Sequence, residues 1–240
     1  MTKDQKLARY LASLVPRSPL QIPIYKFVSR RNLDRFFDTG SIRIGTLHDF
    51  RKTEAHGKWR GDEFEGKSDI MQRVASKNQI DKGSFLSTFI NAPAGVQITD
   101  CIFIERRDFP NCYVFCTSSY FTDELFQHWH EKEGVDACYE IFDWIGYHRE
   151  ISHSLVSRAD GLGSAYVTYV EGDIDGESER RHIYPPFIKK MEYEWQSEFR
   201  GVWLHKAPSI DVKPLCFEIP DARKYCRPYA ILNAGKIQRL

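Results

Sequence analysis

The sequence has almost no charge imbalance and no long hydrophobic run. Its 240 residues contain 34 Lys and Arg against 33 Asp and Glu, a formal net charge of +1. Bulk electrostatics therefore give no strong attraction to nucleic acid or anionic lipid, although a local basic patch stays open. No stretch reaches the ~18 apolar residues of a membrane span, and Arg9 splits the apolar residues near the N-terminus. We expect a cytoplasmic protein with no membrane partner.

The six cysteines include no Cys-x-x-Cys pair and match no disulfide framework of small secreted domains, so we expect reduced thiols. Cys112 and Cys116 share one face of a predicted strand, which disfavours a tight zinc loop. His128 and His130 stand two apart on a predicted helix, about 200° from each other, so they cannot bind one ion together. We predict no metal site.

An acidic run at Asp62, Glu63 and Glu65 lies in a polar stretch from Thr46 to Gly83 that we predict to be a long loop. The run lacks the spacing of an EF-hand, which favours a solvated loop over a cation site. A metal-dependent nuclease built on this loop and the histidines is the least favoured of our alternatives.

Internal repeats and low-complexity segments are absent as well, so the length favours one domain at 21–240 preceded by an N-terminal helix at 1–20. Aromatic and β-branched runs predict strands, and capping residues before apolar stripes predict helices. The predicted strands are 21–28, 41–45, 84–90, 100–105, 112–120, 135–142, 164–170, 193–203 and 212–219, followed by an irregular tail; the predicted helices are 30–39, 122–134 and 144–156. This pattern indicates an α+β fold with curved antiparallel or mixed sheets flanked by short helices.

The predicted strand at 193–203 has one aromatic and one polar face. Residues two apart on a strand project the same way, roughly 6.5–7 Å apart, so Gln196 and Glu198 would reach one small ligand. The alternative is a solvated strand face with cross-strand charge pairs. The aromatic face carries Tyr193, Trp195, Phe199 and Trp203, and the polar face carries Glu194, Gln196, Glu198 and Arg200.

Two other predicted strands carry polar residues that are candidates for the same site. Ser118 and Ser119 terminate an apolar strand, where hydroxyls serve either as strand-end caps or as ligand contacts. Tyr25 and Lys26 lie on the first predicted strand.

The order of the segments "IYKF", "SIRIG", "YVFCTSSY", "LFQHWHEKEGVDACYEI" and "KKMEYEWQSEFR" resembles an uncharacterised bacterial domain family over about residues 25–200. The same order resembles the three-part signature of the ADP-ribosyltransferase superfamily. In that superfamily an Arg, His or Tyr on the first strand, a Ser-Thr-Ser-like middle strand, and a Glu or Gln two residues before an essential Glu bind NAD+ in a cleft between two sheets.

The resemblance implies that Tyr25 takes the first role, Ser118 and Ser119 the second, and Gln196 and Glu198 the third. The middle segment reads Thr-Ser-Ser here, and the first role also fits Arg43 on "SIRIG". The remaining implied contacts are Trp129 or Tyr25 at the nicotinamide half and Arg51 at the pyrophosphate.

In such a reaction the cationic nicotinamide ring leaves the ribose as a neutral group, and the transition state resembles an oxocarbenium ion, so a fixed carboxylate helps more than an acid. The implied function is an NAD+-dependent ADP-ribosyltransferase or NAD+ glycohydrolase, as a bacterial toxin or anti-phage effector. Its acceptor is a nucleic acid or a protein, and an antitoxin or chaperone is an open partner. The alternative from another class is a non-catalytic module of the same fold that binds a ligand or partner.

Overall fold

A computed structural model describes residues 23–52, 62–77, 80–91, 97–207 and 211–240. The helix predicted at 1–20 lies outside these ranges. The described chain is an α+β domain of mainly antiparallel sheets with short helices packed against them, as the sequence predicted. None of its helices is long and apolar enough to cross a membrane.

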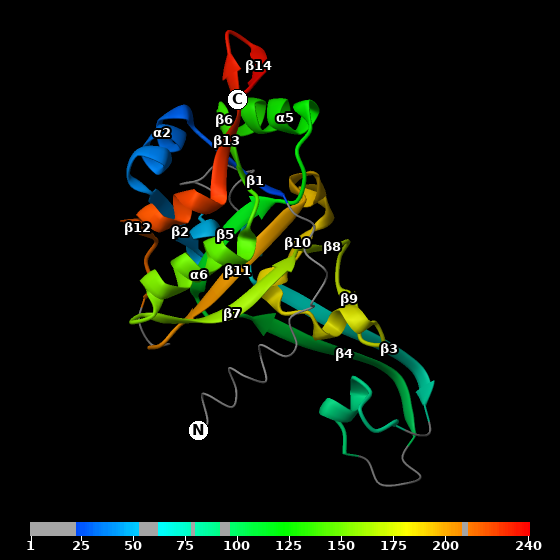
Figure 1. Ribbon diagram of the computed structural model, residues 1–240. Helices are drawn as coiled ribbons and strands as arrows, with labels where there is room; N and C mark the ends of the chain where they lie inside the picture. The colour runs from blue at the N-terminus through cyan, green and yellow to red at the C-terminus, as the bar shows by residue number, and fades with distance from the viewer. Residues whose placement is uncertain (1–22, 53–61, 78–79, 92–96, 208–210) are drawn as a thin grey trace.

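A nine-stranded sheet forms the body of the molecule (Figure 1). Its strands follow the order β12-β2-β5-β1-β6-β13-β14, and β11 joins β5 to β7 on the other side. Their bounds are β1 Ile24–Val28, β2 Ser41–Thr46, β5 Cys112–Ser118, β6 Ala137–Ile141, β7 Ala159–Tyr166, β11 Glu198–His205, β12 Leu215–Glu218, β13 Cys226–Asn233 and β14 Lys236–Arg239.

The sheet branches at β5. One edge of β5 pairs with β11 along its whole length, whereas the other edge pairs with β2 only at Tyr113 and Val114 and with β1 only at Ser118. From these points β1 continues alongside β6, and β2 continues alongside β12. The two outer parts of the sheet therefore diverge from β5 and leave a V-shaped gap opposite 115–117.

Helices cover both faces of this sheet. Helices α2 (Arg30–Thr39) and α6 (Trp144–Leu155) bury their apolar sides in the largest core cluster, where Phe36 stacks on Tyr139. Helix α5 (Asp123–Glu133) packs on the opposite face, against Phe27 and Cys138. The predicted caps are confirmed, since Ser29 accepts a hydrogen bond from the Asn32 backbone and the C-cap glycine Gly40 is left-handed. A fourth helix, α3, spans Leu47–Phe50.

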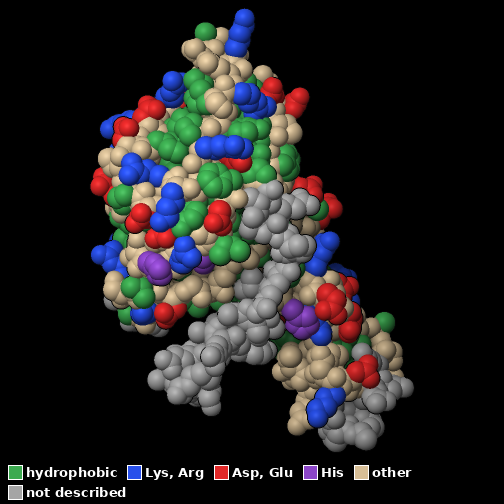
Figure 2. Space-filling view, viewed as in Figure 1, with side chains coloured by type: hydrophobic (Ala, Val, Ile, Leu, Met, Phe, Trp, Pro, Cys, Tyr) green, Lys and Arg blue, Asp and Glu red, His purple; other side chains and the backbone are tan. Residues whose placement is uncertain are grey.

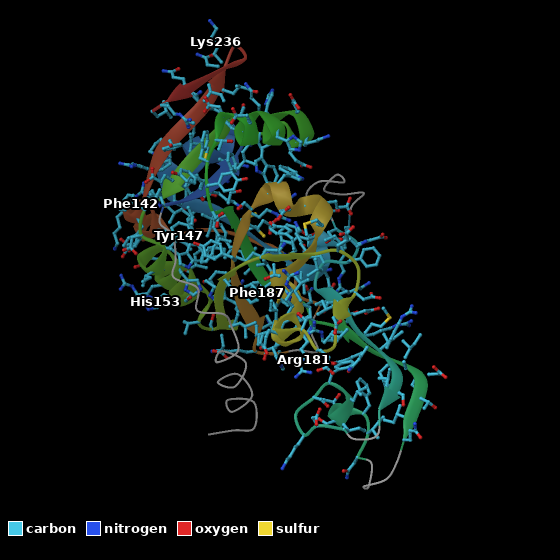
Figure 3. The ribbon with its side chains drawn as sticks, turned by 90° about the vertical axis from the view of Figure 1, so that its right-hand side faces the viewer. Phe142, Tyr147, His153, Arg181, Phe187 and Lys236 are labelled. Atoms are coloured by element: carbon cyan, nitrogen blue, oxygen red, sulfur yellow. The ribbon has the colours of Figure 1, made fainter. Side chains whose placement is uncertain are left out.

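A two-stranded arm projects from the body (Figure 1) and is made of β3 (Lys67–Lys77) and β4 (Ile98–Asp108), with β9 (Ile174–Asp175) beside β3. Arg181 lies where arm and body meet (Figure 3) and donates hydrogen bonds to the carbonyls of Gly83 and Gly176. On the face shown in Figure 2, basic and acidic side chains of the described residues are interspersed, in keeping with the near-zero net charge.

Several predicted elements differ from the observed ones. The predicted strand at 84–90 is a turn with a 3-10 helix, η1 (Leu86–Thr88), because the hydroxyls of Ser87 and Thr88 bond backbone carbonyls three residues earlier. The predicted loop at 46–83 contains β3, which owes its form to ten cross-strand pairs with β4 rather than to its composition.

The last part of the chain is also more regular than predicted. The expected irregular tail forms η5 (Pro220–Tyr225), β13 and β14, and a bulge at Pro228 interrupts the alternation that would have marked β13. The predicted strand at 164–170 is split into β7 and β8 (Thr168–Val170). Four short elements lead from β9 to β11 and carry residues of the site described below. They are η2 (Glu179–His182), η3 (Pro185–Phe187), β10 (Ile188–Lys190) and η4 (Met191–Gln196).

Two glycines that end helices provide a matched test of this packing. Gly40 (φ 78°) and Gly134 (φ 64°) are both left-handed, but a Cβ at Gly40 would lie 2.5 Å from the Ile219 carbonyl, whereas a Cβ at Gly134 would have no neighbour within 4 Å. We expect Gly40→Ala to lower the free energy of unfolding by about 3 kcal/mol or more and Gly134→Ala by about 1 kcal/mol, measured by urea denaturation. Equal losses would contradict the close approach of α2 to η5.

Candidate functional site

A cavity of about 430 Å³ occupies the V-shaped gap, within the size range of small-molecule sites. Strands β1, β2, β5 and β11 and helices α2 and α5 contribute to its wall. The predicted site residues that line it are Tyr25, Arg43, Ser118, Trp129, Gln196 and Glu198. Glu65, Lys189 and Arg200, which no prediction assigned to the site, line it as well.

The register of the sheet brings the three separated segments together. Ser118 on β5 lies directly opposite Tyr25 on β1 and, on its other side, directly opposite Glu198 on β11. Directly opposite residues of antiparallel strands point to the same face with Cβ atoms about 4.5–5.5 Å apart. Residues far apart in the sequence therefore form one row across three neighbouring strands.

Gln196 and Glu198 come together by a route that differs from the prediction. Gln196 ends the 3-10 helix η4, Ser197 has a left-handed φ of 42°, and Glu198 begins β11. The shared direction of a continuous strand is therefore not the cause. Both side chains nevertheless accept a hydrogen bond from the Lys189 ammonium, at 2.7 Å to Gln196 Oε1 and 2.8 Å to Glu198 Oε1.

Contacts with Ser119 hold the left-handed turn at Ser197. The Ser119 backbone amide donates to the Ser197 carbonyl at 2.8 Å, and the two hydroxyls share a hydrogen bond of 2.5 Å. A non-glycine residue in this conformation costs on the order of 1 kcal/mol, which these bonds offset. Ser119 thus lies beside the site but not among the residues that line the cavity, whereas the Ser118 hydroxyl donates to the Gln196 carbonyl at 2.7 Å.

Four buried charged residues form an ion network at the cavity wall: Glu65, Lys189, Glu198 and Arg200. Arg200 binds Glu198 Oε2 through Nε at 2.5 Å and Glu65 through both terminal nitrogens at 2.5 and 3.0 Å. Lys189 holds the other oxygen of Glu198. The network has two positive and two negative members, so its formal charges cancel, as burial of this kind requires.

The network fixes the charge state of Glu198. Burial alone would raise the pKa of this carboxyl group, but the neighbouring Arg200 and Lys189 outweigh burial and lower the pKa to about 2. Burial opposes the charge of Arg200 too, yet the two glutamates raise its pKa well above the usual value. Glu198 is therefore a permanent anion near neutral pH, suited to electrostatic stabilisation and unsuited to donating a proton.

The expectation of a solvated surface is wrong for the inner residues of two polar segments, although Glu63 and Glu194 are exposed. Glu198 and Arg200 are 7% and 1% exposed, so the polar face of β11 does not open onto water. In the acidic run, Asp62 and Glu65 are buried, and burial together with the charge of Glu65 raises the pKa of Asp62. The left-handed Gly66 (φ 72°) follows the turn that directs Glu65 inward.

An aromatic wall lies on the α5 side of the cavity. Trp129 stacks on Phe27 at a ring-centroid distance of 5.9 Å and packs against Trp195 at 4.9 Å. Tyr25 packs against Tyr229, and burial, followed by the effect of Tyr229, raises the pKa of the Tyr25 phenol. Flat, partly apolar surfaces of this kind suit a planar ring.

The two predicted arginines differ in position. Arg43 lines the cavity and pairs with Asp49 at 2.5 Å. Arg51 is not among the cavity-lining residues, since its guanidinium binds the Glu65 carbonyl at 2.7 Å and the Asp108 carboxylate at 2.6 Å. Arg51 therefore holds the turn at 62–66, which carries Glu65 of the ion network, and does not reach the cavity.

Sequence reasoning missed Glu65 and Lys189. Glu65 lay in a run interpreted as a solvated loop, and Lys189 lies on β10, which pairs with β8 and not with the main sheet. No local pattern connects either residue with Glu198. Among the described residues, no group of three or more His, Cys, Asp or Glu side chains is arranged to hold a metal ion.

The described chain is thus an α+β protein with a branched antiparallel sheet and a polar cavity at the branch. It matches no known protein-family model and has no significant match among curated proteins or solved structures. The resemblance to ADP-ribosyltransferases stays a prediction carried by the residues quoted for it.

The network predicts how stability depends on pH. The folded-state pKa of Glu198, about 2, lies below its ordinary value of 4.5, so its contribution is complete above pH 4.5 and is lost as the pH falls toward 2. We expect Glu198→Gln to be less stable than wild type by about 3 kcal/mol at pH 7, and this difference to shrink between pH 4.5 and 2.5 in urea unfolding.

The exposed Glu194, four residues earlier, provides the control, because Glu194→Gln makes the same chemical change outside the network. Glu194→Gln should leave the free energy of unfolding within about 0.5 kcal/mol of wild type at pH 7 and at pH 2.5. A difference between wild type and Glu198→Gln that stays constant with pH would show that the buried cations do not hold Glu198 ionised.

Proposed function

We propose that this protein is an NAD+-consuming ADP-ribosyltransferase that acts in the cytoplasm and binds NAD+ in the cavity beside β5. The observation that carries the proposal is the row Tyr25, Ser118 and Glu198 across three adjacent strands, facing a cavity of ligand size. The resemblance, which rests on the sequence alone, assigns the same three residues to one site.

In the proposed reaction the bond between nicotinamide nitrogen and ribose C1′ breaks, and its electron pair leaves with neutral nicotinamide. Positive charge develops on the ribose. Glu198, ionised and fixed in place, stabilises that charge and accepts a hydrogen bond from the ribose 2′-hydroxyl. An acceptor nucleophile then forms a new bond to C1′ and releases a proton.

The aromatic wall and the neighbouring polar groups support binding of the nicotinamide half. Trp129 and Tyr25 offer ring faces, and Arg43 supplies a cation at the β2 side of the cavity for the pyrophosphate. Gln196, beside Glu198, is placed to orient the acceptor.

The acceptor is a nucleic acid, a protein or, in a glycohydrolase, water. A role as a bacterial toxin or anti-phage effector, with an antitoxin or chaperone over the cleft, belongs to the same proposal. It rests on the resemblance alone.

A second candidate, a non-catalytic binding module of the same fold, is favoured by a specific observation. Both carboxylate oxygens of Glu198 are occupied by cations, at 2.8 Å from Lys189 and 2.5 Å from Arg200. Such a neutral buried network also serves to join elements of a core. The metal-dependent nuclease has less support, because Glu65 of the acidic run binds Arg200.

Release of nicotinamide from NAD+ by the purified protein tests the proposal. We expect Glu198→Gln to lower the rate by about 100-fold or more, since it removes the charge that stabilises the transition state. Glu194→Gln, which changes an exposed carboxylate in the same segment, should keep the rate within about twofold of wild type.

Circular dichroism of each variant at the assay temperature separates loss of chemistry from loss of fold. Equal nicotinamide release by wild type and a folded Glu198→Gln would remove Glu198 from the chemistry. Binding of NAD+ without any release, by wild type and variant alike, would favour the binding module.

A further inference from the structure

The Lys189 ammonium lies between the two carboxylates of the ion network. It donates to Glu198 Oε1 at 2.8 Å and to Gln196 Oε1 at 2.7 Å, and it lies 4.0 Å from Glu65 Oε2. The Tyr193 ring faces it at 4.7 Å. An ammonium has three protons, so the third can be directed at Glu65.

Glu65 has room for this bond. Its two oxygens accept hydrogen bonds from Arg200, but a carboxylate offers about four acceptor positions. A shift of the ammonium by roughly 1 Å would convert the present 4.0 Å separation into a charge-assisted hydrogen bond. Glu65 and Lys189 are 1% and 4% exposed, so water does not compete for the pair.

Glu198 is the member of the network that a ligand reaches most easily. It is the most exposed of the four residues, at 7%, and it lines the cavity. Its Oε2 is held by Arg200, which Glu65 and the Pro186 carbonyl fix in turn. Oε1 is held only by Lys189 among these cations, on a side chain with four rotatable bonds.

We propose that Lys189 is a displaceable counter-ion, which moves from Glu198 to Glu65 when NAD+ binds and leaves Glu198 Oε1 to the ribose hydroxyl beside the cationic ring. This inference rests on the proposed function. Lys189 is a positioning residue, since it acts through Glu198 and not on the substrate. The arrangement explains how a carboxylate whose two oxygens are both bonded by cations can still bind the ligand.

A double-mutant cycle tests the transfer, with carba-NAD+ as the probe because it keeps the pyridinium ring and cannot be cleaved at the glycosidic bond. Dissociation constants are measured for wild type, Lys189→Met, Glu65→Gln and the double variant. If Lys189 must move to Glu65, Glu65→Gln blocks the move and weakens binding by about tenfold or more in the wild-type background. In the Lys189→Met background no ammonium needs a destination, so the same change should weaken binding by less than about threefold.

A Lys189 ammonium that stays paired with Glu198 would give a different result in this cycle. If Lys189 stays on Glu198 throughout, Glu65→Gln alters only the long-range field and weakens binding by the same factor in both backgrounds, which would overturn the inference. Lys190→Met is the matched control, because this neighbouring ammonium lies over the Phe64 ring and Lys190 does not line the cavity. It should leave the affinity for carba-NAD+ unchanged.

The outcomes separate this inference from the proposed function. Nicotinamide release and carba-NAD+ binding by wild type, combined with an additive cycle, would reject the displaceable counter-ion and keep the transferase. Failure of wild type both to bind carba-NAD+ and to release nicotinamide would reject both. Thermal unfolding shows whether Lys189→Met is folded. If it is not, Lys189→Gln takes its place in the cycle, because it removes the same charge and keeps a polar group beside Gln196.

Discussion

Arg200 joins the buried carboxylate of Glu198 to that of Glu65, which lies 135 residues from Arg200 in the chain, and the rest of the site depends on these bonds. A buried glutamate without a partner would cost several kcal/mol, so Glu65, Glu198 and Arg200 are stable only together. Lys189 brings the fourth charge from the small β8–β10 sheet. One neutral cluster thereby ties the turn at 62–66, the strand β11 and the small sheet to the wall of a single cavity.

The branch of the main sheet at β5 gives this cluster access to a ligand. Because β1 and β2 occupy opposite ends of the same edge of β5, no strand of the described residues pairs with the middle of that edge. Lys26 crosses the gap, where its ammonium donates to the Cys116 carbonyl at 2.5 Å and lies 4.6 Å from the Phe115 ring centre. The same ion pairs that stabilise the core thus face a cavity, so the stability and the chemistry of Glu198 cannot be varied independently.

Local patterns predicted the elements whose stability is local. Ser29 and Gly40 mark the ends of α2 because a cap and a left-handed residue satisfy backbone groups within a few residues. The shared face of Glu198 and Arg200 on β11 is confirmed, since residues two apart point to the same side of any strand. The stretch at 84–90 has the composition of a strand, but its hydroxyls bond their own backbone and form a turn. Composition alone does not show whether these hydroxyls bond the local backbone or leave it to pair in a sheet.

The sequence by itself determined the α+β class, the limits of helices α2, α5 and α6, and the chain order of the three segments that meet at β5. Only the tertiary structure decided that the polar row of β11 is buried, that Gln196 and Glu198 meet at Lys189 from the two sides of a left-handed turn, and that Glu65 belongs to the site. The physical reason is the range of the interactions. Caps and side-chain periodicity act over a few residues, whereas a buried charge needs a partner that the chain supplies from any distance, and no local pattern records which one.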